Sequence, residues 1–386
     1  MPYGVGERDA RPGSPSDAAH CGRQLRQPRS DTMSSPFFNA PRPALIAAGA
    51  RICTLVIDAE ESFNWDTPVR GTAYTTFCMR NIGELHRIVG AYGVAPAYLL
   101  TYPVLEDVDV VRNLRRQVEK GRCVLGVQLH PWVTPPFGDE IGTRYSFSGN
   151  LRSGLEERKL IALKSKFVEC FGFEPLAYRS GRYGVSRETA GLLEKHGFTI
   201  DTSLAPRTTF GAEGGPDTTT LDYGLFWFGK ERNLLEVPLC RSVVGWAGLA
   251  AGSLYHNLNI SWTTHSPISA MLSRSRCAER ITLSPEGNDF PAMRRLVNGL
   301  CARGQTILAL SFHSSSLEVG GNPYVMARAD LHAFYDRLSA VLDYFANDLD
   351  FGFADTLHVP DHLLDAPPLT LPCDFTIPAD AMGRRC

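Results

Sequence analysis

The chain lacks the features that mark membrane, secreted and nucleic-acid-binding proteins. It has no apolar run of the roughly 18 to 20 residues that cross a bilayer, and residues 1–32 contain no apolar signal core. Its formal net charge is −2, without the block of Lys and Arg that a phosphate-binding surface needs. We therefore expect neither a transmembrane segment nor a nucleic-acid partner.

The ten cysteines lack the spacing of a metal or redox motif, because no two of them form a C-x-x-C pair. Cys53, Cys123 and Cys240 lie inside apolar runs, where a free thiol behaves as a small hydrophobic side chain. We expect reduced thiols and a cytoplasmic location. A secreted protein with disulfide bonds is the alternative.

Length and composition allow one large domain or two small ones, with 386 residues of which 44% are apolar and 21% charged. Residues 1–45 are expected to be a disordered leader or an over-extended start. Residues 46–366 are expected to form one catalytic barrel, and the Pro-rich residues 367–386 a peripheral tail.

From about residue 51, β and α patterns alternate along the chain. Short β-branched apolar runs predict strands, and apolar residues at helical spacing predict helices. The predicted strands are 52–58, 95–100, 123–130, 175–179, 198–201, 234–239 and 306–313. The predicted helices are 79–92, 108–120, 155–171, 186–196, 291–303 and 330–347. This alternation is typical of an α/β fold with a parallel sheet.

Polar residues stand where five of these strands end: Asp58, His130, Arg179, Asp201 and His313. A parallel barrel gathers the carboxyl ends of its strands on one face, where barrel enzymes build their active sites. The pattern therefore favours a barrel with one catalytic face. An open doubly wound sheet is the alternative, but the first strand is not followed by the Gly-rich turn of a nucleotide site.

Asp58, Glu60 and Glu61 place three carboxylates within four residues. Such close like charges need a cation or bound protons between them. At the mouth of a barrel they suit a metal ligand combined with a general base, and a solvated acidic turn is the alternative. The segment that follows is apolar and contains Trp65.

Gln128, His130 and Trp132 alternate, so they face one side of an extended segment. An amide, an imidazole for base or metal work and a flat aromatic ring suit a sugar or amide subsite. A histidine satisfied by backbone groups is the alternative.

The turn from Arg179 to Gly184 carries two guanidiniums, and one of them could hold a carboxylate bidentately. The alternative for Arg182 is a surface residue.

Asp201 could orient a histidine or cap the next turn. His313 precedes a flexible loop, and an imidazole there suits protonation of a leaving amine.

In these residues and their order, the chain resembles the NodB-type polysaccharide deacetylases. The matching segments span residues 52–320: Asp58-x-Glu60, the His130 segment, Arg179-Ser-Gly-Arg-Tyr-Gly, Asp201-Thr-Ser and Leu310-Ser-Phe-His313. The resemblance implies a distorted (β/α)7 barrel that hydrolyses an N-acetyl or other amide bond, often on a sugar. It implies that Asp58 is the general base, that Arg179 tethers it, and that His313 is the general acid. It further implies that Asp201 supports the acid and that Glu60 or Glu61 binds a metal.

The second motif departs from the family. It normally carries two histidines four residues apart that bind a divalent metal, whereas here Gln128 stands in the first position and His130 lies two residues later. Thr134, four residues after His130, is not a strong ligand. A divalent metal, zinc in the first place, is therefore expected on Glu60, Gln128 and His130.

Taken together, we expect a hydrolase of a small carbohydrate or amide substrate. Four residues are expected to bind it: Trp132, Trp65, Arg182 and Tyr183. Three alternatives stay open, namely a metal-independent hydrolase of cyclic ureides such as allantoin, an inactive sugar-binding relative, and a glycoside hydrolase with two carboxylates. The sequence leaves the formation of homo-oligomers open.

Overall fold

The structure is a computed structural model that describes residues 41–62, 74–138, 142–152, 154–245 and 279–367. The helices and strands of the central unit alternate in chain order: β2 (Ile52–Ala59), α1 (Ile82–Gly90), β3 (Ala97–Leu100), α2 (Tyr102–Glu106), α3 (Val108–Glu119), β4 (Val124–Leu129), α4 (Leu155–Phe171), β5 (Ala177–Ser180), α5 (Arg187–Lys195), β6 (Ile200–Asp201), β8 (Leu234–Glu236), α8 (Phe290–Cys301), β11 (Ile307–His313) and α9 (Arg328–Asp343). The alternating pattern predicted from the sequence is thus confirmed.

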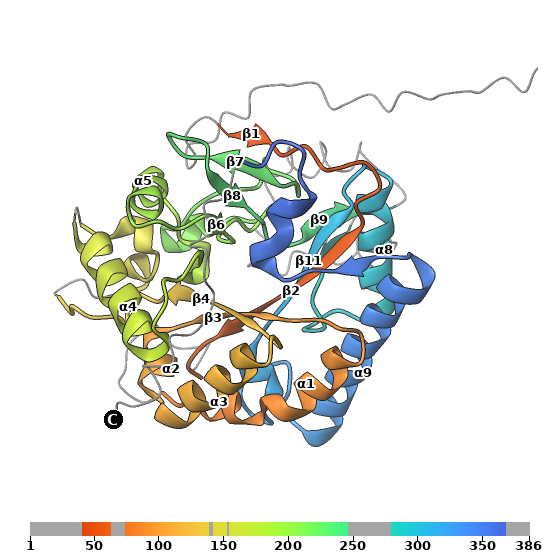
Figure 1. The fold of residues 1–386 in the computed structure, drawn as a ribbon, viewed down its shortest axis with the longest axis horizontal. Coiled ribbons are helices and arrows are strands. Elements are labelled where there is room, and N and C mark those ends of the chain that lie inside the picture. The colour runs from red at the N-terminus through yellow and green to blue at the C-terminus, as the bar shows by residue number, and fades with distance from the viewer. Residues whose placement is uncertain (1–40, 63–73, 139–141, 153, 246–278, 368–386) are drawn as a thin grey trace, which may run out of the picture.

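Seven strands run parallel in the order β8-β6-β5-β4-β3-β2-β11. β7 (Phe226–Phe228) and then β1 (Arg42–Pro43) extend the sheet antiparallel beyond β8, and β12 (Gly352–Phe353) pairs with β2. In Figure 1 the helices form an outer rim around these strands, with α4 and α5 on one side and α1, α8 and α9 on the other. The predicted α/β class with a mostly parallel sheet is confirmed.

The outer strands of the parallel set are linked through Leu283. Its backbone N donates to Cys240 O at 2.7 Å, and its O accepts from Ser311 N at 3.1 Å. Cys240 precedes β9 (Arg241–Val244), and Leu283 follows β10 (Glu279–Thr282), the antiparallel partner of β9. The β9–β10 ribbon therefore stands between β8 and β11 and completes a distorted barrel.

Burial and capping explain why these segments take these forms. Every residue of β2 is buried, as expected for a parallel strand covered on both faces. Helix α5 begins at Ser186, whose Oγ accepts from the backbone N of Glu188 and Thr189. Helix α4 ends at Gly172, whose φ of 81° is the left-handed conformation that glycine adopts without strain. The start of α5 and the end of α4 agree with the helices predicted from the sequence, 186–196 and 155–171.

The strands that the sequence pattern missed are short or polar. β7 is apolar but has only three residues, which is short for a strand, whereas β9 begins with Arg241-Ser242 and lacks the apolar run that predicts a buried strand. The six cysteines of the described residues are free. Within the same residues, no helix combines the length and apolarity needed to span a bilayer.

Candidate active site

One face of the parallel sheet carries four of the side chains selected from the sequence: Asp58, Gln128, Arg179 and His313. In the ladder His313 lies opposite Asp58, and Gln128 lies opposite Arg179. The register continues from Asp58 through β3 to Gly126, two residues before Gln128. Because side chains two residues apart in a strand point to the same face, these polar groups converge at the carboxyl end of the strands.

Asp58 and Arg179 form a buried ion pair, with side chains 4% and 2% exposed. Arg179 Nη1 donates to Asp58 Oδ1. Arg179 Nε donates to Thr202 O at 3.1 Å and to Thr202 Oγ1 at 2.9 Å. Burial opposes the guanidinium charge, but the Asp58 carboxylate together with Tyr183 and Glu236 outweighs it, so the pKa of Arg179 is raised. The pair fixes Oδ1 of Asp58 and leaves Oδ2 facing His313.

Glu286 holds His313 in place. His313 Nδ1 lies 2.8 Å from Glu286 Oε2, the backbone N of His313 donates to Oε1 at 2.9 Å, and Ser316 Oγ donates to the same Oε1. This carboxylate makes Nδ1 the donor and turns Nε2 toward Asp58 Oδ2, 3.6 Å away. Burial disfavours the charged imidazole, but Glu286, Glu60 and Asp58 outweigh it and raise the pKa of His313 to about 10. His313 therefore carries a proton at neutral pH.

The structure corrects the partner expected for Asp201. The acid on His313 Nδ1 is Glu286, whereas Asp201 accepts from the backbone N of Ser203 at 3.1 Å and from Ser203 Oγ. This is the local turn-capping role that the sequence left open for Asp201. The prediction that Asp201 supports His313 was wrong, because Glu286 is the acid that does so.

The register explains why Asp201 is absent from the catalytic face. Asp201 lies opposite Tyr178, the residue before Arg179, and opposite Glu236. Successive side chains point to opposite faces of a strand, so Asp201 points away from Arg179. Burial raises the pKa of Asp201 to about 6 and raises that of Glu236 well above its usual range. These two acids form a buried carboxyl pair behind the site.

His130 lies between Glu60 and Glu61. Its Nδ1 is 2.8 Å from Glu61 Oε1, and its Nε2 is 3.5 Å from Glu60 Oε2. Trp132 Nε1 donates to Glu61 Oε1 at 3.1 Å, and the Trp132 ring stacks on His130 with centroids 4.1 Å apart. Burial disfavours the imidazolium, but Glu61, Glu60 and Asp58 outweigh it and raise the pKa of His130. One face of Trp132 is thus covered by His130.

The residues predicted to hold a metal do not match a usual catalytic zinc site, in which three strong ligands are typical. No group of three or more His, Cys, Asp or Glu side chains within the described ranges is arranged to hold a metal ion. Glu60 and His130 are strong donors, whereas Gln128 adds a weak amide oxygen. The buried Oε1 atoms of Glu60 and Gln128 have no hydrogen-bond partner among the described residues. Both oxygens can therefore receive a ligand, but no step proposed below passes through a metal.

Burial dominates the protonation of Glu60. It raises the pKa of Glu60 to about 8, although the imidazoles of His313 and His130 oppose this. Burial therefore favours the neutral form of this carboxyl group.

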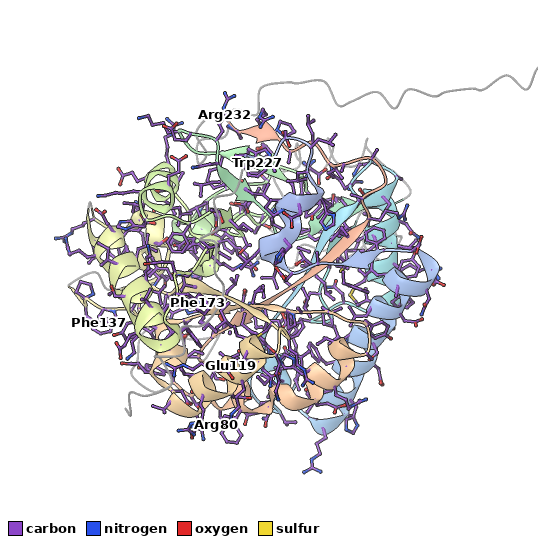
Figure 2. All side chains as sticks on the ribbon, in the orientation of Figure 1. Arg80, Glu119, Phe137, Phe173, Trp227 and Arg232 are labelled. Atoms are coloured by element: carbon purple, nitrogen blue, oxygen red, sulfur yellow. The ribbon has the colours of Figure 1, made fainter. Side chains whose placement is uncertain are left out.

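Buried Lys159 of α4 fixes the loop that carries His130 and Trp132. Lys159 Nζ donates to three backbone oxygens at 2.9, 2.6 and 2.8 Å, those of Pro131, Thr134 and Pro136. Phe137, in the same loop, is 69% exposed and lies at the outer edge of the molecule in Figure 2. Three carbonyls around one ammonium hold the loop in one conformation, so α4 positions His130.

Gly181 permits the close approach of β5 to His130. A Cβ at Gly181 would lie 2.5 Å from His130 Cδ2 and 2.7 Å from Leu129 O, distances that no side chain tolerates. The next residues, Arg182 and Tyr183, have φ values of 53° and 58°. This left-handed conformation is rare outside glycine, and such strain clusters at functional sites.

Of the four predicted substrate-binding residues, Tyr183 lies beside Arg179 of the Asp58–Arg179 pair. The Tyr183 ring centroid lies 5.7 Å from Arg179 Cζ, and the ring stacks on Phe210. Arg182 instead forms an ion pair with Glu213. Trp132 is described above, and Trp65 lies outside the described residues.

Sequence reasoning missed Glu286, Glu236 and Lys159. Glu286 follows a strand, as the selected residues do, but β10 is too polar to be recognised as one. Glu236 lies inside a predicted apolar strand, and Lys159 lies on the buried side of a predicted helix. A charged residue inside an apolar pattern was the available signal, because burial of a charge requires a partner.

No protein-family model and no curated protein matches the chain. Solved structures similar in fold include a candidate polysaccharide deacetylase from Mycobacterium smegmatis, with 15% identity, a TM-score of 0.45, and coverage of 84% of this chain and 94% of that chain. PuuE allantoinase has 13% identity and a TM-score of 0.41, covering 82% and 91%. The Bc1960 peptidoglycan N-acetylglucosamine deacetylase has 11% identity and a TM-score of 0.38, covering 83% and 91%. All three are likenesses in fold at low identity.

Proposed function

We propose that the chain hydrolyses a non-peptide amide bond, and that its preferred reaction removes an acetyl group from an acylated amine such as an N-acetylated sugar. One observation carries the proposal. A carboxylate held by a buried arginine faces an imidazole held by a second carboxylate, in the pairs Asp58–Arg179 and His313–Glu286. A pure binding module has no need of two catalytic groups that are each supported in this way.

The geometry suits general base and general acid catalysis. Asp58 Oδ2 and His313 Nε2 lie 3.6 Å apart, and the His313 side chain is 23% exposed. Asp58 takes a proton from water while the water oxygen bonds to the acyl carbon. His313 then gives its Nε2 proton to the amide nitrogen as the C–N bond breaks, which yields a carboxylic acid and a free amine. Proton exchange with solvent restores both groups.

Gln128 offers a hydrogen-bond acceptor to the substrate. Its buried Oε1 has no partner among the described residues and lies on the same face as Arg179. A buried acceptor without a partner costs about 1 to 3 kcal/mol. The N–H of a substrate amide would remove this cost and orient the amide between Asp58 and His313.

The proposal is tested by incubating the purified protein with N-acetylated sugars and measuring amine and acetate. We expect the two products in equal amounts. Elemental analysis before and after chelation accompanies the assay. Stoichiometric metal with turnover lost on chelation would establish the divalent metal that the sequence predicts. Turnover that persists without metal would leave the chemistry to Asp58 and His313.

A cyclic ureide is the second candidate substrate, favoured by the small number of strong metal donors around His130. The same assay with a cyclic ureide, followed by ring opening, distinguishes the two. Ring opening without any release of acetate from sugars would select this candidate.

Replacing Glu286 with glutamine is expected to move the alkaline limb of kcat/KM to lower pH by at least about one pH unit. In the native protein His313 loses its proton near pH 10, so activity falls as pH rises through that value. The neutral amide removes the carboxylate that raises this pKa, and the fall therefore begins earlier. Asp355→Asn is the matched control, since Asp355 pairs with the exposed His358 at 2.8 Å. An unchanged limb in Glu286→Gln would contradict the role of His313 as the acid.

A further inference from the structure

Arg241 is a partly buried guanidinium that pairs with no carboxylate among the described residues. It opens β9, where its Nε donates to Thr282 Oγ1 at 2.8 Å and its Nη1 to Thr208 Oγ1 at 2.7 Å. Both acceptors are neutral hydroxyls. Nearby arginines differ, because Arg182 and Arg207 pair with carboxylates. The two hydroxyls fix the guanidinium plane and leave Nη2 without a protein acceptor within the described part of the chain.

Arg241 is linked to the catalytic pair through Thr208, Phe210 and Tyr183. Its Nη1 donates to Thr208 Oγ1, Thr208 lies two residues before Phe210, and the Phe210 ring stacks on Tyr183 with centroids 6.3 Å apart. Tyr183 lies beside Arg179, and the charges of Arg179, Asp58, Arg241 and Glu286 all act on its phenol, although burial is the main reason that the pKa of Tyr183 rises to about 12. Tyr183 thus contacts both Arg179 and Phe210, and Phe210 belongs to the segment that holds Arg241 through Thr208.

The charge balance of the site gives this arginine a purpose. The acids of the site already have cationic partners: Asp58 pairs with Arg179, Glu286 with His313 and Glu61 with His130. Arg241 has no such partner among the described residues, so its charge is available to an anionic group of the substrate. Guanidinium binds the two oxygens of a carboxylate in its plane, and two donors in a fixed orientation make this contact specific.

We propose that Arg241 binds a carboxylate of the substrate, so that this site acts on acylated amines that carry an acidic group, such as acylated amino acids or acidic sugars. The inference rests on the proposed amide hydrolysis for the rest of the substrate. Thr208 and Thr282 are positioning residues that orient the guanidinium, and Tyr183 forms the surface between the carboxylate and the amide to be cleaved.

Binding to the full-length protein tests the inference independently of turnover. The probes are N-methanesulfonyl derivatives of glycine, β-alanine and γ-aminobutyrate, each compared with its neutral carboxamide. These sulfonamides resist hydrolysis, and the series varies the distance to the carboxylate. For at least one length, we expect calorimetry to show the acid binding about 10-fold tighter than its amide. Arg241→Gln should abolish this preference, Arg241→Lys should retain part of it, and Arg112→Gln on the exposed face of α3 should keep it whole.

Each outcome decides one of the two proposals. Equal affinity within every pair, no binding of any acid, or a preference that survives in a folded Arg241→Gln protein would overturn the role of Arg241. Thr282→Val provides a second variant, expected to reduce the preference a few-fold without removing the charge. A preference that depends on Arg241, together with no amine release from any acylated substrate, would keep the carboxylate site and reject the hydrolase.

Discussion

Asp58→Asn is expected to lower kcat by about 1,000-fold or more, since general base catalysis contributes roughly 10² to 10⁴ and Asp58 Oδ2 lies 3.6 Å from His313 Nε2. Asparagine keeps the shape of the side chain and can still accept from Arg179, but it cannot take a proton from water. Amine release under saturating substrate measures the effect.

The same substitution is expected to destabilise the protein. Asp58 and Arg179 are both buried, and removing one charge of a buried pair leaves the other without compensation. Breaking such a pair typically costs about 3 to 5 kcal/mol. Denaturant unfolding measures this loss, and the activity comparison is made at a temperature where the variant is folded.

The matched control is Asp109→Asn, which removes the partner of Arg112 in an exposed pair. Exposed pairs contribute about 0 to 1 kcal/mol, so stability and turnover should both stay near the native values. Near-native turnover in a folded Asp58→Asn protein would reject the base assignment. Loss of turnover with full stability would reject the account of the buried pair.

His313→Asn is expected to lower kcat by about 100-fold or more while substrate binding changes only a few-fold. The asparagine amide can replace Nδ1 toward Glu286, but nothing replaces the proton at Nε2. The deficit should depend on the leaving group, because an amine of low basicity departs without prior protonation. Acetylated 4-nitroaniline should therefore be affected less than an acetylated alkylamine.

His358→Asn is the control for this substitution, because His358 also pairs with a carboxylate at 2.8 Å but is exposed. It should retain turnover on both substrates. Equal losses of His313→Asn on both leaving groups, or a loss of affinity as large as the loss of rate, would show that His313 does not protonate the amine.

Much of the architecture followed from local patterns. The seven parallel strands and the helices between them agree with apolar runs and helical spacing, and the ends of α4 and α5 agree with Gly172 and Ser186. These features are encoded within a few residues, because the periodicity of burial and the chemistry of helix caps act locally.

The position of residues at strand ends was equally informative. Asp58, Arg179 and His313 were selected because each closes an apolar run, and the ladder brings all three to one face. Asp201 was selected on the same evidence, yet it faces the other way. A shift of one residue in register moves a side chain to the opposite face, and the sequence contains no local record of register between neighbouring strands.

The sequence by itself determined the α/β class, the order of the strands along the chain and the candidates at their carboxyl ends, since each depends on contacts within one segment. Only the tertiary structure decided which groups meet. Glu286 reaches His313 across 26 intervening residues, Lys159 holds a loop more than 20 residues before it, and the β9–β10 ribbon brings Arg241 toward Tyr183. Such partnerships depend on how segments distant in the chain pack together, and burial then selects the pairs because an unpaired charge is costly away from water.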